Sequence, residues 1–299
     1  MKTGKTSFSK QLPNNLLLAF EKGYNALSGI KAVDINKWSE LKLVLRQLEK
    51  PEAKAMYNTI TIDTVSIAWD MCEQFVCAQA GVQKIGDIPW GSGYSQCKKE
   101  FESTLRKITM LGYGLLLIAH SAVRKEKTAD DSEVEILSPD LSKRAYEVCN
   151  GIVDLIGYIG TEYDENAQGK QYLYTRETPT IFAGSRFHYL APKVPFSYKN
   201  LVDAISEAID KEQELDGATV VDTAENKDVG EEIPSYNDIR AEANALWNEL
   251  VEKDEENAAR ILKKVEMVFS RKLKLSEITE DQADLFYLVL LDMREMANE

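Results

Sequence analysis

The sequence has few of the residues that build disulfide frameworks, zinc sites or membrane spans. Its 299 residues include four cysteines and two histidines, and no two cysteines have the C-x-x-C spacing. This pattern disfavours both a disulfide-stapled secreted fold and a structural zinc site, so we expect reduced thiols. No apolar run approaches the roughly 18 residues of a membrane helix, and the amino terminus lacks the apolar core of a signal peptide. The sequence therefore predicts a soluble protein of the cytoplasm, with no membrane partner.

Basic residues are scarce in the last third of the chain. Residues 201–299 carry 11 Lys and Arg against 26 Asp and Glu, whereas residues 1–200 carry 25 against 23. The formal net charge of −13 therefore belongs to the tail, and the nearly neutral front part can still present a local basic patch. The total charge does not exclude a nucleic-acid partner. A hydrophobic content of 44% excludes a wholly disordered chain and suffices for one large or two modest domains.

Short apolar runs alternate with segments of helical periodicity in the first 200 residues. The apolar runs, each short enough for a strand buried on both faces, are residues 16–20, 59–62 and 115–119. Helical spacing is found at residues 5–12, 36–50, 65–80, 96–111, 141–150 and 199–214. Further extended segments are expected at residues 152–159, 171–175 and 178–186, with irregular stretches at 81–95 and 124–135. This alternation predicts an α/β fold with a doubly wound, mostly parallel sheet, whose ligands bind beyond the carboxyl ends of the strands.

The last third of the chain predicts a separate helical unit. Residues 215–235 are polar and acidic, as in a flexible linker, and residues 236–299 show apolar side chains at helical spacing. The expected domains are therefore an α/β core at residues 1–214, the linker, and a small all-α domain at 236–299. The tail is expected to recruit a replication or recombination protein, or simply to pack against the core.

The start of the chain carries part of a phosphate-binding motif. Gly4, Lys5, Thr6 and Ser7 match the second half of the pattern G-x-x-x-x-G-K-[ST], at the start of a predicted helix. In this pattern the backbone amides and the lysine bind nucleotide phosphates, and the Thr6 hydroxyl binds Mg²⁺. The first glycine and the strand that leads into the loop would stand before Met1, so the expected sheet lacks its first strand. On these four residues alone, a chance match or a capped surface helix is about as frequent as a nucleotide site.

Polar side chains follow the three apolar runs. Asp63 directly follows the second run, where an acid suits Mg²⁺, and Glu21 follows the first, where it is placed to take a proton from an attacking water. His120 and Ser121 follow the third run, where either side chain can contact a γ-phosphate. Each residue alone also fits a plainer role, as a helix cap, a solvated rim residue or a core histidine. Their joint occurrence after Gly-Lys-Thr favours a site for ATP and Mg²⁺.

The order of these segments resembles that of a known family. Gly4-Lys5-Thr6, followed by NLLLAFEKGYNAL, NTITIDTVSIAWD and GLLLIAHSAVRKEK, is similar to RecA-like ATPases, most closely to the phage-encoded Sak group of single-strand annealing and recombination ATPases. The resemblance covers roughly residues 1–200 and implies a RecA-like P-loop NTPase core. It also implies that Lys5 and Thr6 are the phosphate-loop pair, Asp63 the metal-side acid, Glu21 the catalytic glutamate and His120-Ser121 the γ-phosphate sensor.

The resemblance further implies a DNA-contacting loop at about residues 123–144. Its basic residues are Arg124, Lys125, Lys127, Lys143 and Arg144, and five acidic residues lie among them. In this family a basic residue after a late strand reaches the nucleotide of a neighbouring subunit, which here points to Arg186. A surface arginine paired with the acidic rim is the plainer alternative. An arginine acting in trans requires a homo-oligomer, ring or filament, with ATP at the subunit interfaces.

These expectations define a leading function and two alternatives. The leading one is a DNA-stimulated ATPase of phage recombination or replication that acts on single-stranded DNA in the host cytoplasm. Its catalytic residues are expected to be Lys5, Glu21, His120 and Arg186. The first alternative is a nucleotide-dependent scaffold or loader that assembles with another protein without touching DNA. The second is a structural subunit that binds no nucleotide.

Overall fold

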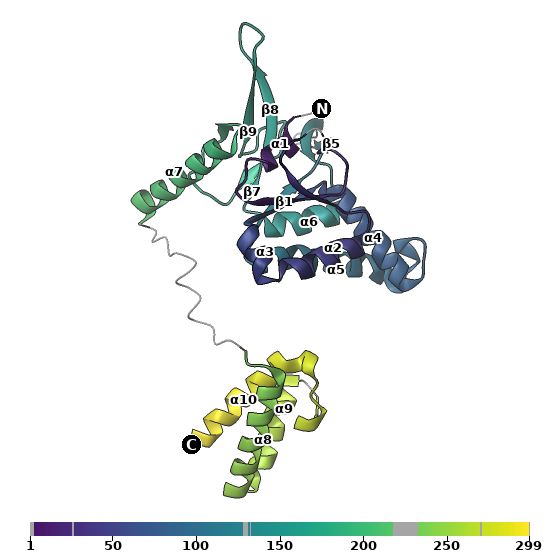
Figure 1. The fold of residues 1–299 in the computed structure, drawn as a ribbon, viewed down its shortest axis with the longest axis vertical. Helices are drawn as coiled ribbons and strands as arrows, with labels where there is room; N and C mark the ends of the chain where they lie inside the picture. The colour runs from purple at the N-terminus through teal and green to yellow at the C-terminus, as the bar shows by residue number, and fades with distance from the viewer. Residues whose placement is uncertain are drawn as a thin grey trace. The chain divides into compact units, whose positions relative to one another are not determined.

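Four short strands form the centre of the amino-terminal part of the chain. The computed structural model describes residues 3–25, 27–127, 131, 133–217, 233–269 and 271–298, in two units, Met1–Val220 and Val221–Glu299 (Figure 1). The strands of the first unit are β1 (Asn15–Ala19), β2 (Lys31–Asp34), β3 (Thr59–Asp63) and β4 (Gly114–Ile118). They pair in parallel in the order β2-β1-β3-β4. The predicted parallel sheet is therefore confirmed.

The register of this sheet brings the carboxyl ends of its strands together. Ala19 of β1 lies opposite Asp63 of β3, and Asp63 lies opposite Ile118 of β4. Every residue of β1 and β3 is buried, as an apolar strand inside a parallel sheet requires. In β4, which forms an edge of the sheet among the described residues, the three leucines are only half-buried. The residues that follow β1, β3 and β4 thus emerge side by side.

Three helices pack on one face of the sheet and bury its largest side chains. They are α2 (Trp38–Leu48), α4 (Val65–Ala80) and α5 (Ser92–Met110), and they form one layer in Figure 1 together with α3 (Pro51–Met56). The Phe101 ring stacks on Trp38 at a centroid distance of 5.6 Å and meets Trp69 edge-on at 5.1 Å. This aromatic cluster packs against Leu18 and Ile62 of the central strands. Helices expected at residues 36–50 and 65–80 are therefore present.

Smaller elements complete the first unit. The helices are α1 (Lys5–Ser9), α6 (Lys143–Ile152) and α7 (Tyr198–Asp216), with the 3₁₀ turns η1 (Ile85–Asp87) and η2 (Pro89–Gly91). The antiparallel strands are β5 (Ser121–Lys127), β6 (Glu133–Pro139), β7 (Leu155–Ile156), β8 (Tyr158–Tyr163), β9 (Gly169–Tyr174), β10 (Gly184–Ser185) and β11 (Lys193–Pro195). The β8-β9 hairpin projects from the rest of the unit in Figure 1.

Several local expectations were wrong. In the polar stretch at 124–135, residues 124–127 belong to β5 and residues 133–135 to β6, two antiparallel strands that pair with each other, and Lys125 reaches Glu133 across the pair. The expected loop at 81–95 contains η1, η2 and the first turn of α5. The helix expected at 5–12 ends at Ser9, and residues 152–159 divide into the end of α6, β7 and the start of β8. Strand β2 was not expected, since its residues are exposed or half-buried and form no apolar run.

The second unit is helical, as expected. It contains α8 (Tyr236–Lys253), α9 (Glu256–Phe269) and α10 (Ala283–Asn298), with the turns η4 (Leu275–Glu277) and η5 (Glu280–Gln282). Ile239, Val265 and Phe286 from the three helices are fully buried in a core of their own. Most of the expected linker, residues 218–232, lies outside the described residues. No helix in the described part of the chain has the length and apolarity needed to cross a membrane.

Glu100 ties α5 to α2 and gives the first unit a pH-dependent stability. Its carboxylate accepts hydrogen bonds from Trp38 Nε1 at 2.8 Å and Lys42 Nζ at 2.7 Å. Burial raises the pKa of Glu100, but the hydrogen bonds from Lys42 and Trp38 outweigh burial, so this pKa lies below its usual value. A lowered folded-state pKa adds stability above the unfolded pKa, and this stability is lost as the pH falls through the folded-state pKa.

We therefore expect Glu100→Gln to lower the free energy of unfolding by about 1–2 kcal/mol at neutral pH, a figure discounted because Lys42 is partly exposed. The difference from the wild type should shrink below about pH 4, where the wild-type carboxyl also becomes neutral. Urea unfolding followed by tryptophan fluorescence at several pH values measures both the loss of stability at neutral pH and its decrease at low pH. Glu102→Gln is the matched control, because among the described residues the ion pair of Glu102 is with Arg106 of its own helix. An equal loss at pH 3 and pH 7 would contradict the assigned role of the Glu100 charge.

Candidate functional site

A hydrogen bond joins the start of the chain to the end of the central strand β3. Thr6 Oγ1 donates to Asp63 Oδ2 at 2.6 Å, and Asp63 is only 3% exposed. Gly4 precedes α1 in the left-handed conformation with φ of 80°, which a glycine adopts without strain. The Gly-Lys-Thr segment, whose Thr6 stands 57 positions before Asp63 in the sequence, thus lies at the carboxyl edge of the sheet.

The residues after β1 and β4 reach the same edge. The backbone N–H groups of Phe20 and Glu21 both donate to the Asp63 carbonyl, at 2.7 and 3.3 Å. Glu21 Oε2 lies 3.4 Å from His120 Nε2, and a Cβ built on Gly23 would lie 3.6 Å from Glu21 Oε1 and 4.0 Å from Thr6 Oγ1. Thr6, Glu21, Asp63 and His120 therefore surround one small region. Their roles, like that of Ser7 on the exposed side of α1, remain predictions.

The charges of this region act on Asp63. Burial is the main cause that raises the pKa of Asp63, and the nearby charge of Glu21 raises it further. The hydrogen bond from Thr6 and the positive charges of Lys5 and His120 lower the pKa, but less than burial raises it. Asp63 and Glu21 thus lie close together beside Lys5 and His120, and burial is what makes the charged form of Asp63 costly.

The donor set suits a magnesium ion that also binds phosphates. The Thr6 hydroxyl and the Asp63 carboxylate supply hard oxygen atoms 2.6 Å apart. Among the described residues there is no group of three or more His, Cys, Asp and Glu side chains that would hold a metal by themselves. Mg²⁺ needs no such group, because it keeps several waters and takes other ligands from substrate phosphates. Thr6 and Asp63 are accordingly the residues that fit Mg²⁺.

Lys5 and His120 border a cavity of about 330 Å³. Thr3 and Ser121 add polar groups at the same border, whereas the rest of the lining is mainly apolar and comes from β4, α6 and the strands that follow. This volume lies within the range of pockets that hold small ligands. The ammonium predicted to bind phosphates and the histidine predicted to sense them therefore border a common space.

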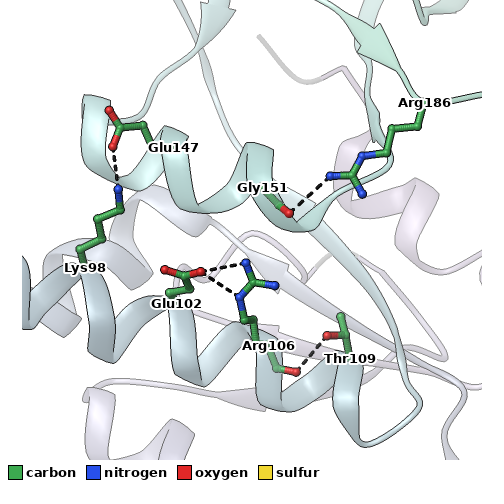
Figure 2. Close-up of polar contacts among 7 residues, drawn as sticks. All are labelled: Lys98, Glu102, Arg106, Thr109, Glu147, Gly151 and Arg186. Atoms are coloured by element: carbon green, nitrogen blue, oxygen red, sulfur yellow. Dashed lines mark hydrogen bonds and ion pairs between the residues drawn. The ribbon is translucent and has the colours of Figure 1, made fainter.

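Arg186 lies apart from these residues. Its guanidinium donates to Asp154 Oδ1 at 2.9 Å. It also donates to the carbonyl of Gly151, near the end of α6, at 3.4 Å (Figure 2). The plainer alternative from the sequence, a surface arginine paired with an acid, describes this arrangement. A role in the nucleotide site of a neighbouring subunit remains a prediction, and it would require the pair with Asp154 to open.

The basic residues predicted to contact DNA fall into two groups. Arg124 is held by the Leu141 and Pro139 carbonyls at 2.6 and 3.3 Å, and Lys125 and Lys127 pair with Glu133 and Asp131 on the hairpin. In contrast, Lys143 and Arg144 begin α6 and make no ion pair within the described residues. The cations at the start of α6 are thus the ones available to an anion.

Sequence reasoning missed that the hairpin is joined to the site. The Asp140 N–H donates to the His120 carbonyl at 2.8 Å, and Ser121 pairs with Pro139, so β5 and β6 rise directly from His120. The alternation of charged and apolar residues in EVEI at residues 133–136 was an available signal for a strand. It was masked by the high polarity of the stretch around it.

Comparisons with known proteins agree with this geometry. A protein family described as an AAA domain matches residues 1–187, more than half of the chain. The chain is also similar to the SPbeta prophage-derived uncharacterized protein YorG of Bacillus subtilis (strain 168). The two are 28% identical over 303 residues, which cover 99% of this chain and 91% of that protein. The chain therefore belongs to the AAA domain family of nucleotide-binding P-loop ATPases.

Proposed function

We propose that this protein hydrolyses ATP and acts on single-stranded DNA in phage recombination or replication, as a RecA-like ATPase of the Sak type. The observation that carries the catalytic part is the convergence of Thr6, Glu21, Asp63 and His120 at the carboxyl edge of the parallel sheet. The prophage origin of a relative that aligns over nearly the whole chain supports the phage context. The β5-β6 hairpin begins at this edge, next to His120, which supports coupling between the nucleotide site and a second ligand.

Each residue of the site has a role that its position supports. Lys5 binds the β- and γ-phosphates, and Thr6 and Asp63 hold Mg²⁺, which neutralises charge on the transferred phosphoryl group. Glu21, beside His120, accepts the proton of the attacking water. His120 senses the γ-phosphate, and its carbonyl, held by the Asp140 N–H, passes the change to the β5-β6 hairpin.

The proposal extends to an assembly. Arg186 acts in trans at the nucleotide of a neighbouring subunit in a ring or filament, once it leaves Asp154. The acidic carboxyl-terminal unit recruits a replication or recombination protein. DNA binds mainly through Lys143 and Arg144, because the other three predicted cations already have partners.

A second candidate, from another class, is a nucleotide-dependent scaffold or loader that does not touch DNA. The observation that favours it is the neutralisation of the hairpin, where Lys125 and Lys127 face Glu133 and Asp131. A surface whose cations are paired releases few counterions on binding DNA and gains little affinity from them. The two candidates share the ATP site and differ in their ligand.

Lys5→Ala is expected to weaken the binding of ATP-Mg²⁺ by about 10- to 100-fold, because a charge-assisted contact to the phosphates is lost. Calorimetric titration with a non-hydrolysable analogue measures this affinity. Lys10→Ala is the matched control, since Lys10 is an exposed lysine just after α1. Equal affinity of the Lys5→Ala and Lys10→Ala proteins would remove the phosphate-loop assignment.

Glu21→Gln is expected to keep ATP affinity and to lower turnover by about 10²- to 10⁴-fold, the usual contribution of a positioned general base. Phosphate release assays and the same calorimetric titration separate the two quantities. Glu52→Gln, an exposed acid on α3, serves as the control that should leave both unchanged. Retained turnover in the Glu21→Gln protein would show that Glu21 is not the base.

Filter binding of oligo(dT) with an ATP analogue tests the DNA part of the proposal. If a few phosphates contact Lys143, Arg144 and their neighbours, affinity should fall by about 10- to 100-fold between roughly 50 and 200 mM salt. Omitting the analogue should weaken binding, because the nucleotide orders the hairpin through His120. Binding that is absent, or that salt does not change, would favour the scaffold.

A further inference from the structure

One tryptophan of the first unit is almost completely exposed. Trp90, in η2 between α4 and α5, is 99% exposed, whereas Trp38 and Trp69 are 1% and 6% exposed. Isolated exposed apolar residues are common, but a tryptophan with its whole ring in solvent is not, because burial of this side chain is especially favourable. The known site does not account for Trp90, since neither the nucleotide edge nor the cavity includes it.

The backbone holds Trp90 in a conformation that a bulky side chain rarely adopts. Its φ of 62° and ψ of 19° are left-handed, and Gly91 follows with φ of 64°. For a large non-glycine residue such a conformation is strained and persists only where the surroundings impose it, often at a binding site. The turn therefore presents the indole ring to solvent in a strained backbone conformation, which its surroundings must hold in place.

Tight packing beneath the turn supplies that restraint. Ile85, the first residue of η1, and Ile88, which follows η1, are each 5% exposed. A Cβ added to Gly93 in the first turn of α5 would lie 2.5 Å from the Ile85 carbonyl oxygen and 2.8 Å from Ile88 Cδ1. Only glycine permits this close approach, so the turn packs tightly against the first turn of α5. Trp90 is thus displayed from a firmly packed support.

The start of α6, with its available cations, lies against the same turn. The Arg144 guanidinium stacks over the Tyr94 ring at 4.3 Å, and the Tyr94 hydroxyl lies 3.5 Å from a Cβ built on Gly86. Lys98 pairs with Glu147 at 2.8 Å, as Figure 2 shows, and Lys143 and Arg144 also act on this one carboxylate. Three cations thus surround one carboxylate beside the turn.

We propose that Trp90 stacks on an unpaired base of single-stranded DNA whose backbone phosphates contact Lys143 and Arg144. Indole rings bind bases of any sequence through their π faces, and nearby cations hold the backbone. Positive charge beside the ring favours a polyanion over an apolar protein groove. The proposal rests on the proposed DNA function and names the surface at which that function takes place.

Two measurements on the same titration test this surface. Binding of labelled oligo(dT) is followed by anisotropy, and the quenching of tryptophan fluorescence reports stacking on Trp90, the exposed indole of the first unit. Trp90→Ala should lower the affinity about 5- to 100-fold and remove most of the quenching. Trp90→Phe should keep part of the affinity, since a smaller ring still stacks. Met110→Ala, which removes another exposed apolar side chain at the end of α5, should change neither quantity.

A further variant separates binding from folding. Trp90→Gly suits the left-handed backbone, so it should preserve thermal stability and DNA-free ATP turnover while losing DNA affinity like Trp90→Ala. If the wild type binds oligo(dT) and the Ala and Gly variants bind it equally well, the surface is wrongly assigned and the DNA function stands. If the wild type itself fails to bind with the ATP analogue present, the DNA function falls and the surface with it. Loss of self-association in these variants, with DNA affinity unchanged, would make Trp90 a protein contact and overturn the proposal.

Discussion

The last residue of β3 is the point on which the site depends. The Asp63 side chain accepts the hydrogen bond of Thr6, and its carbonyl accepts the N–H groups of Phe20 and Glu21. One residue thus joins α1 and the segment after β1 to the central strand. Burial makes ionisation of this carboxyl costly, and the hydrogen bond from Thr6 and the charges of Lys5 and His120 partly offset that cost.

The parallel register explains why the site connects to the hairpin. Asp63, the last residue of β3, lies opposite Ile118, the last residue of β4. His120, two residues after β4, therefore lies close to Asp63 and Glu21. The hairpin leaves from this same residue, and Arg124 fixes its base to the Leu141 carbonyl. A ligand that contacts His120 is therefore connected to the hairpin through a short series of hydrogen bonds. Such an arrangement transmits a change only if the ligand binds two positions of the hairpin unequally.

The predictable parts of the fold are those in which one physical signal dominates. The runs at 16–20, 59–62 and 115–119 are apolar throughout, and residues 65–80 have helical spacing up to Gly81, so strands β1, β3 and β4 and helix α4 were expected almost to the residue. Strand β2 and the β5-β6 hairpin are half-exposed and stabilised by pairing with a neighbouring strand, a contribution that the pattern of their own residues does not carry. The site residues followed from their places at strand ends. The pairing of Glu21 with His120, and of Arg186 with Asp154, depended on side-chain geometry.

The uneven charge of the chain constrains how a polyanion approaches it. Residues 201–299 carry 11 basic against 26 acidic side chains, so the field of the whole protein repels DNA at long range. In the proposed DNA function, attraction would come from local contacts such as Lys143 and Arg144, within a Debye length of about 8 Å at physiological salt. Added salt weakens those contacts and also screens the repulsion from the acidic unit. The net salt dependence of DNA binding should therefore be less steep for the full chain than the number of phosphate contacts alone implies, and stacking, which salt affects little, gains weight.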